Sequence, residues 1–189
     1  DVATAFLQEY YPAALRIPMR GQDPVWVDPT ELAKNMGLTV KNQRIREDGS
    51  VFGQIYFDDT DTVMYDANED ADVPTHIKGK TIVVDPQIYL LRNLGSFNNT
   101  IVHECVHWAK HRKAFKLEQL FNTDASHISC EVVGDADSRI SIKSTKYMEK
   151  QANQLAPRIQ MPKEPFTIKA KEYIAYFMRQ TDARHTVDV

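Results

Sequence analysis

Residues 103 to 107 carry the pattern H-E-x-x-H, which is chemically the most informative feature of the chain. Positions i and i+4 lie on one face of an α-helix, so the imidazoles of His103 and His107 can bind one zinc ion. Glu104 would project beside that ion as a general base, as it does in metal-dependent hydrolases. A buried helix that happens to carry two histidines is the alternative. Only the zinc interpretation requires a third ligand elsewhere in the chain.

The third ligand is expected to be a carboxylate downstream of this pattern. One class of H-E-x-x-H enzymes has a glycine and then a histidine shortly after the motif, but Lys110 and Lys113 stand at those two positions. The inverted form of the motif is absent as well. The acidic residues that are available as ligands are Glu118, Asp124, Glu131, Asp135, Asp137 and Glu149.

Among these residues we favour Glu149, with Glu131 and Asp135 as the main alternatives. Glu149 is expected to lie on a helix, and Asn153 follows one turn later on the same face. The Asn153 side chain could accept a hydrogen bond from the free N–H of a ligand histidine and so fix its tautomer. An ordinary exposed helix glutamate is the other interpretation of Glu149.

Further candidates concern the oxyanion that develops during peptide hydrolysis, which needs a hydrogen-bond donor besides the metal. His127 and Tyr147 are the residues that we would test for this role, although each could also be a plain loop or helix residue. His111 continues the spacing of the two histidines by one further turn, but it could not easily reach the same ion. We therefore expect His111 to support a ligand or to lie at the surface.

Composition excludes several classes of partner. The net charge of −3 and the pI near 6.1 give no general attraction to nucleic acid or to an anionic membrane. The basic run over 110–116 is interpreted as a solvated helix end. No apolar run approaches the length of about 20 residues that spans a bilayer, and two cysteines favour a reducing, cytoplasmic setting. The chain begins at Asp1, which suggests a fragment or a processed product.

Periodicity and capping signals predict a mixed set of elements around the motif. The acidic stretch over 58–72 is expected to be a solvated loop, because Ala71 and Ile77 break the pattern of a calcium-binding loop. Residues 114–143 are expected to be irregular. The predicted helices cover 2–15, 29–36, 99–112, 145–159 and 168–180, and the predicted strands cover 38–40, a hairpin formed by 51–57 with 62–65, and 81–84.

A family resemblance adds to this interpretation. Glu149-Lys150-Gln151-Ala152-Asn153-Gln154-Leu155-Ala156, followed by Met161-Pro162, resembles the E-x-x-A-N-x-F-A-x-x-x-L-M-P segment of the ImmA/IrrE family of metallopeptidases. Residues 100–107 resemble that family's F-T-I-A-H-E-L-G-H, and the predicted helix and strand at 28–37 and 81–85 also lie where the family has them. The departures from the family pattern are at Asn99, Cys105, Val106 and Leu155.

The resemblance implies an α+β, zincin-like fold. In such a fold a small, mostly antiparallel sheet packs on the active-site helix and on a second helix that bears a ligand. It further implies a metallopeptidase domain over 25–165, preceded by an N-terminal extension over 1–24 and followed by a C-terminal helix and tail over 166–189. The long segment between the two ligand helices predicts an insertion over 113–144, which could shape a substrate lid.

The resemblance also implies a function, namely zinc-dependent endopeptidase activity. Zn²⁺ would be held by His103, His107 and Glu149, and Glu104 would accept the proton of the attacking water. The substrate would be a protein partner such as a helix-turn-helix repressor, with no direct contact to nucleic acid. It would bind as an extended strand at a sheet edge, for which we expect residues 51–57. The alternative is a non-catalytic, metal-stabilised interaction module of a mobile-element or toxin–antitoxin system.

Overall fold

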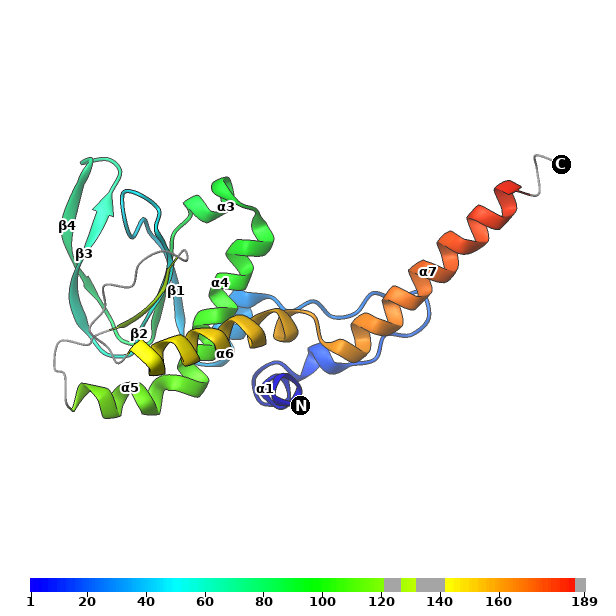
Figure 1. Cartoon of the computed structure of the whole chain (residues 1–189), viewed down its shortest axis with the longest axis horizontal. Helices are drawn as coiled ribbons and strands as arrows, with labels where there is room; N and C mark the ends of the chain where they lie inside the picture. Colours follow the sequence, from blue (N-terminus) through cyan, green and yellow to red (C-terminus); the bar gives the residue numbers. More distant parts are fainter. Residues whose placement is uncertain (121–126, 132–141, 186–189) are drawn as a thin grey trace.

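The computed structural model describes residues 1–120, 127–131 and 142–185, and its side-chain detail covers 1–117, 120 and 146–180. Helices and strands are mixed along the chain, which confirms the α+β class (Figure 1). In chain order the elements are α1 (Val2–Tyr10), the 3-10 helix η1 (Pro12–Leu15), α2 (Pro29–Asn35), β1 (Thr39–Asn42), β2 (Val51–Tyr56), β3 (Thr60–Asp66), β4 (Ala71–Ile77), β5 (Thr81–Val84), α3 (Gln87–Leu91), α4 (Leu94–Val106), the π-helix η2 (His107–His111), α5 (Arg112–Gln119), β6 (His127–Glu131), α6 (Ile142–Gln160) and α7 (Lys163–His185).

A four-stranded sheet with the strand order β1-β5-β2-β6 forms the middle layer. β5 pairs parallel with β1, whereas β2 pairs antiparallel with both β5 and β6, so the small sheet is mostly antiparallel as predicted. β5 is a run of β-branched residues, which suit a pleated and buried backbone. The expectation that 51–57 offers an edge to a substrate is wrong, because β2 is hydrogen-bonded on both sides.

The two faces of the sheet are covered by different layers. Ile82 and Val84 pack into the core formed with the helices, whereas Val83 packs with Met64 of β3 and Ile77 of β4. Figure 1 shows the β3–β4 hairpin on one side of the sheet and α4 on the other. The site described below lies on the helical side, because its residues come from α4, η2 and α6.

The predicted pairing of 51–57 with 62–65 is wrong, because β3 pairs with β4 in a separate two-stranded sheet. The chain reverses after Asp66, whose carboxylate accepts a hydrogen bond from the backbone N–H of Asn68, and Asp70 adopts a φ of 49°. Aspartate and asparagine stabilise such turns through their own backbone contacts. The acidic stretch over 58–72 is therefore mainly strand and turn rather than a solvated loop.

The motif lies on a helical segment that is longer than predicted. α4, η2 and α5 follow one another without a break from Leu94 to Gln119, so the helix predicted over 99–112 is confirmed but extends at both ends. Its start is set by Asn93, whose side chain caps the backbone N–H of Ser96. Its last turns are held by Phe115, which is buried and stacks on Phe57 with ring centroids 4.4 Å apart. Residues 114–119 are thus helical rather than irregular.

Helix α6, which carries Glu149, packs directly against α4. Ala152, Ala156 and Ile159 are buried in the main core, and the two small side chains allow a close approach of the helices. The predicted helix over 145–159 is confirmed, with observed bounds of 142 and 160. Within the predicted 113–144 insertion, the structure describes the end of α5 and the strand β6, and the rest lies outside the described residues.

The N-terminal segment contributes to the same core as the H-E-x-x-H motif. Phe6 and Leu7 of α1 are buried in the cluster that also contains Ile101 and Val102 of α4. α2 begins as predicted, because the Asp28 carboxylate accepts hydrogen bonds from the backbone N–H groups of residues 30 and 31. The predicted division of the chain at residues 24 and 165 stays a prediction.

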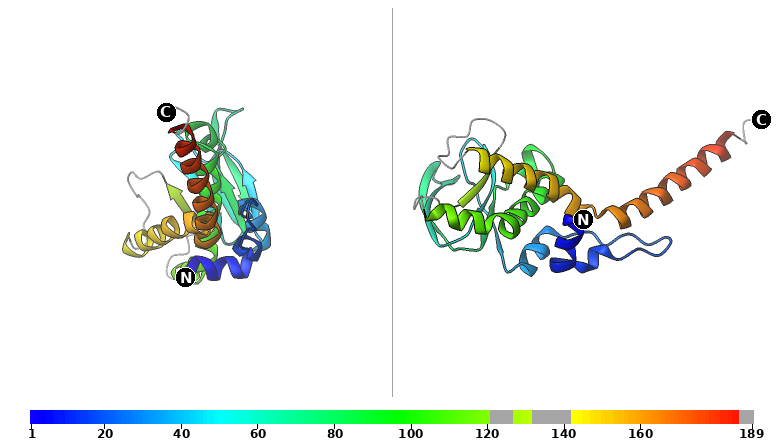
Figure 2. Two further views of the ribbon diagram at one scale, coloured as in Figure 1. Left: turned by 90° about the vertical axis from the view of Figure 1, so that its right-hand side faces the viewer. Right: turned by 60° about the horizontal axis from the view of Figure 1, so that its bottom comes forward.

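The C-terminal helix α7 runs away from the rest of the molecule, as Figure 1 and the right-hand view of Figure 2 show. Near its base the ammonium group of Lys169 lies 3.0 Å from the carboxylate of Asp23. Within the described ranges, no helix combines the length and the apolar character needed to cross a membrane. Large apolar side chains exposed along α7 are Phe166, Tyr173, Ile174, Tyr176, Phe177 and Met178.

Candidate metal centre

The three residues predicted as metal ligands lie together. One ligand atom from each of His103, His107 and Glu149 falls within 4.8 Å of the other two. The Nε2 atoms of the two histidines are 2.9 Å apart. Oε2 of Glu149 lies 3.2 Å from Nε2 of His103, and Oε1 of Glu149 lies 3.2 Å from Nε2 of His107. The histidines come from α4 and the start of η2, and the carboxylate comes from α6, so packing of the two helices assembles the group.

The donor chemistry of this group fits a divalent metal ion. The Nε2 atoms of His103 and His107 face each other at hydrogen-bond distance. A neutral imidazole carries a proton on only one of its two nitrogens. One oxygen of Glu149 is buried and lacks a hydrogen bond, because its approach to His107 does not have hydrogen-bond alignment. A cation would satisfy these converging electron pairs. Two imidazoles and one carboxylate form the kind of three-ligand set that leaves a position open for a reactant.

Charge states at neutral pH also suit metal binding. Burial lowers the pKa of His107 to about 4, although the neighbouring Glu149 acts in the opposite direction. Burial alone would raise the pKa of Glu149, but the two adjacent imidazoles outweigh it and lower the pKa to about 2. His107 is therefore neutral and Glu149 ionised near pH 7, which are the forms that bind a metal.

Glu104 stands beside this group as a buried acid without a partner. Its side chain is fully buried, and neither carboxylate oxygen makes a hydrogen bond to any described residue. Burial raises the pKa of this carboxyl group well above its usual value, and the negative charge of Glu149 raises it further. A carboxyl group that is both buried and perturbed in this way is typical of acid–base catalysis.

Sequence reasoning missed Gly53, which makes room for Glu104. A Cβ atom added at Gly53 would lie 3.2 Å from an oxygen of Glu104 and 2.5 Å from the Cγ2 atom of Thr100. Strand β2 can therefore approach α4 this closely only because residue 53 has no side chain. A glycine inside an apolar strand is the signal that could have found it, since such glycines often mark a close approach of the backbone.

The predicted support of a ligand histidine by Asn153 is not seen among the described contacts. The Asn153 side chain is exposed on α6, and no hydrogen bond joins it to a histidine among the described residues. His111 lies closer to the ligands instead. Its Nδ1 atom is 3.0 Å from Nδ1 of His107, and its Nε2 atom is 3.0 Å from Oε1 of Gln151. Burial lowers the pKa of His111, which keeps this imidazole neutral at neutral pH.

The remaining candidates lie further from the cluster or outside the described side chains. Tyr147 is 63% exposed, and its hydroxyl accepts a hydrogen bond from Gln151. His127 opens β6, where its backbone pairs with Tyr56, and its side chain lies outside the described part. The same holds for the side chains of the alternative ligands Glu118, Asp124, Glu131, Asp135 and Asp137.

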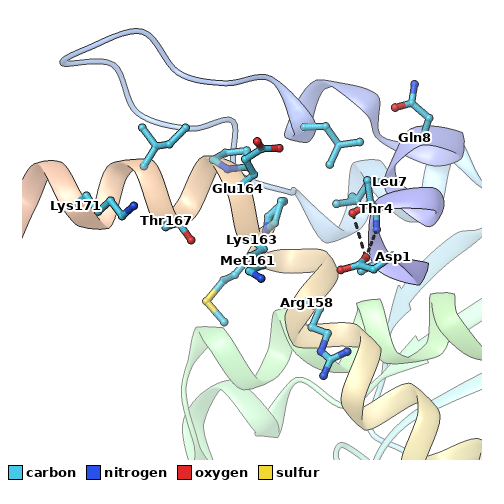
Figure 3. Close-up of a pocket in the computed structure, with 15 residues that line it drawn as sticks. Asp1, Thr4, Leu7, Gln8, Arg158, Met161, Lys163, Glu164, Thr167 and Lys171 are labelled. Atoms are coloured by element: carbon cyan, nitrogen blue, oxygen red, sulfur yellow. Dashed lines mark hydrogen bonds between the residues drawn. The ribbon is translucent and has the colours of Figure 1, made fainter.

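A separate cavity of about 1100 Å³ lies between α1 and the junction of α6 with α7. Figure 3 shows Arg158 and Met161 on one side of it, Thr4 on α1, and Lys171 on α7. None of the three clustered metal-ligand candidates lines this cavity. Among the described residues, the group that could hold a metal ion lies at the contact between α4, η2 and α6.

Comparison of the chain with protein-family models, with curated proteins and with solved structures finds no match.

Proposed function

We propose that this chain is a zinc-dependent endopeptidase. The observation that carries the proposal is the position of Glu104, a fully buried carboxyl group without a partner, next to the donors His103, His107 and Glu149. A purely structural metal site has no use for such an acid, because burying a carboxylate without a hydrogen bond is unfavourable by several kcal/mol. A catalytic site needs it as the group that moves a proton.

The ligands define how the site would act. His103, His107 and Glu149 would hold the ion, and a bound zinc ion supplies Lewis-acid chemistry at a peptide carbonyl. Glu104 would take the proton of the attacking water and return it to the leaving amine. Its raised pKa favours holding the proton until it is returned, because a carboxyl group of ordinary pKa is almost fully ionised at neutral pH.

Strand β6 is the edge that an extended substrate would use. It pairs with β2 on one side and forms one end of the sheet order. The residue opposite Gly53 in this pairing is Cys130, so β6 runs next to the strand that faces Glu104. A peptide added to β6 would gain backbone hydrogen bonds close to the proposed catalytic group.

The ImmA/IrrE resemblance supports a protein as the substrate. Family members act on helix-turn-helix repressors, and we propose such a repressor as the partner of this chain. Recognition would be of the repressor protein, and the net charge of −3 offers no general attraction to DNA. Cytoplasmic activity would be consistent with this partner.

The direct test is zinc analysis combined with cleavage of a proteome-derived peptide library by the wild type and by Glu104→Gln. We expect both proteins to bind zinc, and we expect the variant to generate new amino termini at least about a hundredfold more slowly. Glu31→Gln, at an exposed position of α2, is the matched control and should cleave normally. Unchanged cleavage by Glu104→Gln would exclude the proposed base. Zinc binding without cleavage by the wild type would favour the non-catalytic interaction module.

A further inference from the structure

A chain of hydrogen bonds leads from one ligand histidine to the surface. Nδ1 of His107 lies 3.0 Å from Nδ1 of His111, and Nε2 of His111 lies 3.0 Å from Oε1 of Gln151. The amide of Gln151 in turn donates to the hydroxyl of Tyr147 at 3.0 Å. The two histidines are buried, and Tyr147 is mostly exposed. These contacts connect η2 with α6, which supplies the carboxylate ligand.

The direction of each hydrogen bond follows from the chemistry of the groups. Oε1 of Gln151 can only accept, so Nε2 of His111 must carry a proton. A neutral His111 then has no proton on Nδ1, which therefore accepts from Nδ1–H of His107. His107 is consequently left with an unprotonated Nε2, and this is the atom that faces His103 and Glu149.

We propose that His111 and Gln151 are positioning residues of the metal centre, which fix His107 in the tautomer that presents Nε2 to a metal. The inference rests on the proposed metal-dependent function and adds a dedicated support for one ligand. Such supports orient the ring and exclude the tautomer that cannot bind. Only His107 has such a support in the described structure, because Nδ1 of His103 is buried and makes no hydrogen bond there. The π-helical turn of η2 spans this supported pair.

The first test reads the tautomers directly in the metal-free wild type. Long-range ¹⁵N–¹H correlation spectra of the imidazoles should show His107 protonated on Nδ1 and His111 protonated on Nε2. This readout does not depend on metal or on activity. A spectrum with the proton of His107 on Nε2 would overturn the proposal, even if the protein binds zinc and cleaves peptides.

The second test measures zinc affinity by competition with a chelating indicator. His111→Phe removes the acceptor and should weaken zinc binding by roughly 10–100-fold. His111→Asn returns an oxygen acceptor near the position of Nδ1 and should recover most of the loss. Gln151→Leu provides a second variant should His111→Phe fail to fold, and exposed Lys150→Ala is the control. Wild-type zinc affinity in His111→Phe and Gln151→Leu would overturn the role.

The two tests separate the failure of this inference from the failure of the proposed function. A wild type that binds no zinc would exclude the proposed peptidase function. In that case the tautomers of His107 and His111 alone decide whether the proposed hydrogen-bond chain exists. If the wild type binds zinc and cleaves peptides, but zinc affinity does not depend on His111, the peptidase function stands and the positioning role of His111 is excluded.

Discussion

Replacing Glu104 by glutamine should stabilise the metal-free protein. The carboxyl group is fully buried, lacks a hydrogen bond among the described residues, and has a pKa well above its usual value. An acid whose pKa is raised in the folded state binds its proton more tightly there than in the unfolded chain. Its unfavourable contribution is therefore absent below the unfolded pKa near 4.5 and grows as the pH rises above it.

The expected gain follows from the type of group that is removed. A buried polar group without a partner costs about 1–3 kcal/mol, and a charged one costs more. A neutral amide keeps part of this cost and loses the part that comes from ionisation. We expect Glu104→Gln to raise the free energy of unfolding by about 1–3 kcal/mol at pH 7, with a melting temperature higher by roughly 2–4 °C per kcal/mol.

Urea denaturation of the chelator-treated proteins at pH 7 and near pH 4.5 is the appropriate assay. The difference between wild type and variant should shrink at the lower pH, because the carboxyl group is then largely protonated in the unfolded chain as well. Glu31→Gln is the matched control, since Glu31 accepts a hydrogen bond from the hydroxyl of Tyr11 at 2.8 Å and should gain nothing. A Glu104→Gln variant that is less stable than the wild type at pH 7 would refute the reasoning.

Three further predictions concern the surroundings of this acid. Zinc at about a hundred times its dissociation constant should stabilise the wild type by about 2.7 kcal/mol, and Glu149→Gln should lose most of that gain in thermal melts. An equal gain in both proteins would exclude Glu149 as a ligand. Gly53→Ala should destabilise the fold by about 1–3 kcal/mol in urea, because its Cβ would lie 2.5 Å from Thr100 Cγ2, and wild-type stability would contradict this packing. The pKa of His107 is lowered to about 4, so the free energy of unfolding of the metal-free protein should fall by up to about 3 kcal/mol between pH 6.5 and 4. The same fall with pH in His107→Ala would contradict this assignment.

Local sequence signals predicted the elements that they directly encode. Asp28 and Gly37 delimit α2 because one caps the first turn and the other adopts a φ of 73° just after the last. The β-branched run 81–84 forms a strand for an equally local reason. The spacing of His103 and His107 likewise fixes a shared helical face, so the paired imidazoles follow from sequence alone.

Strand pairing was harder to predict because partners are chosen by the whole sheet. The run 51–57 has the composition of a strand, but its composition does not reveal that β5 and β6, both distant in sequence, take its two edges. The chain reverses between Asp66 and Asp70, and β3 pairs with β4 across this turn. The wrong partner left 51–57 as an expected sheet edge, although β2 is an inner strand.

The sequence analysis allowed for His111 as a support of a candidate ligand, but it missed the partner of His111 on α6 for a geometric reason. Helical spacing places Asn153 one turn after Glu149, but this rule says nothing about how the facing helix is turned. His111 ends η2, which is π-helical, and contacts Gln151, whereas single-residue periodicity assumes an α-helix throughout. The α6 residue that contacts His111 is Gln151, two positions after Glu149.

Two features that each lower stability meet at one point of this fold. A glycine inside a strand is unfavourable by roughly 0.5–1 kcal/mol relative to alanine, and a buried acid without a partner is more unfavourable still. Gly53 and Glu104 are such a pair, and they face each other across the contact of β2 with α4. An apolar side chain at 104 would remove one cost. The other would remain, because a Cβ at 53 would still lie 2.5 Å from Thr100 Cγ2. The presence of an unpartnered acid at 104, beside three candidate metal donors, is best explained by a requirement for an acid at that place.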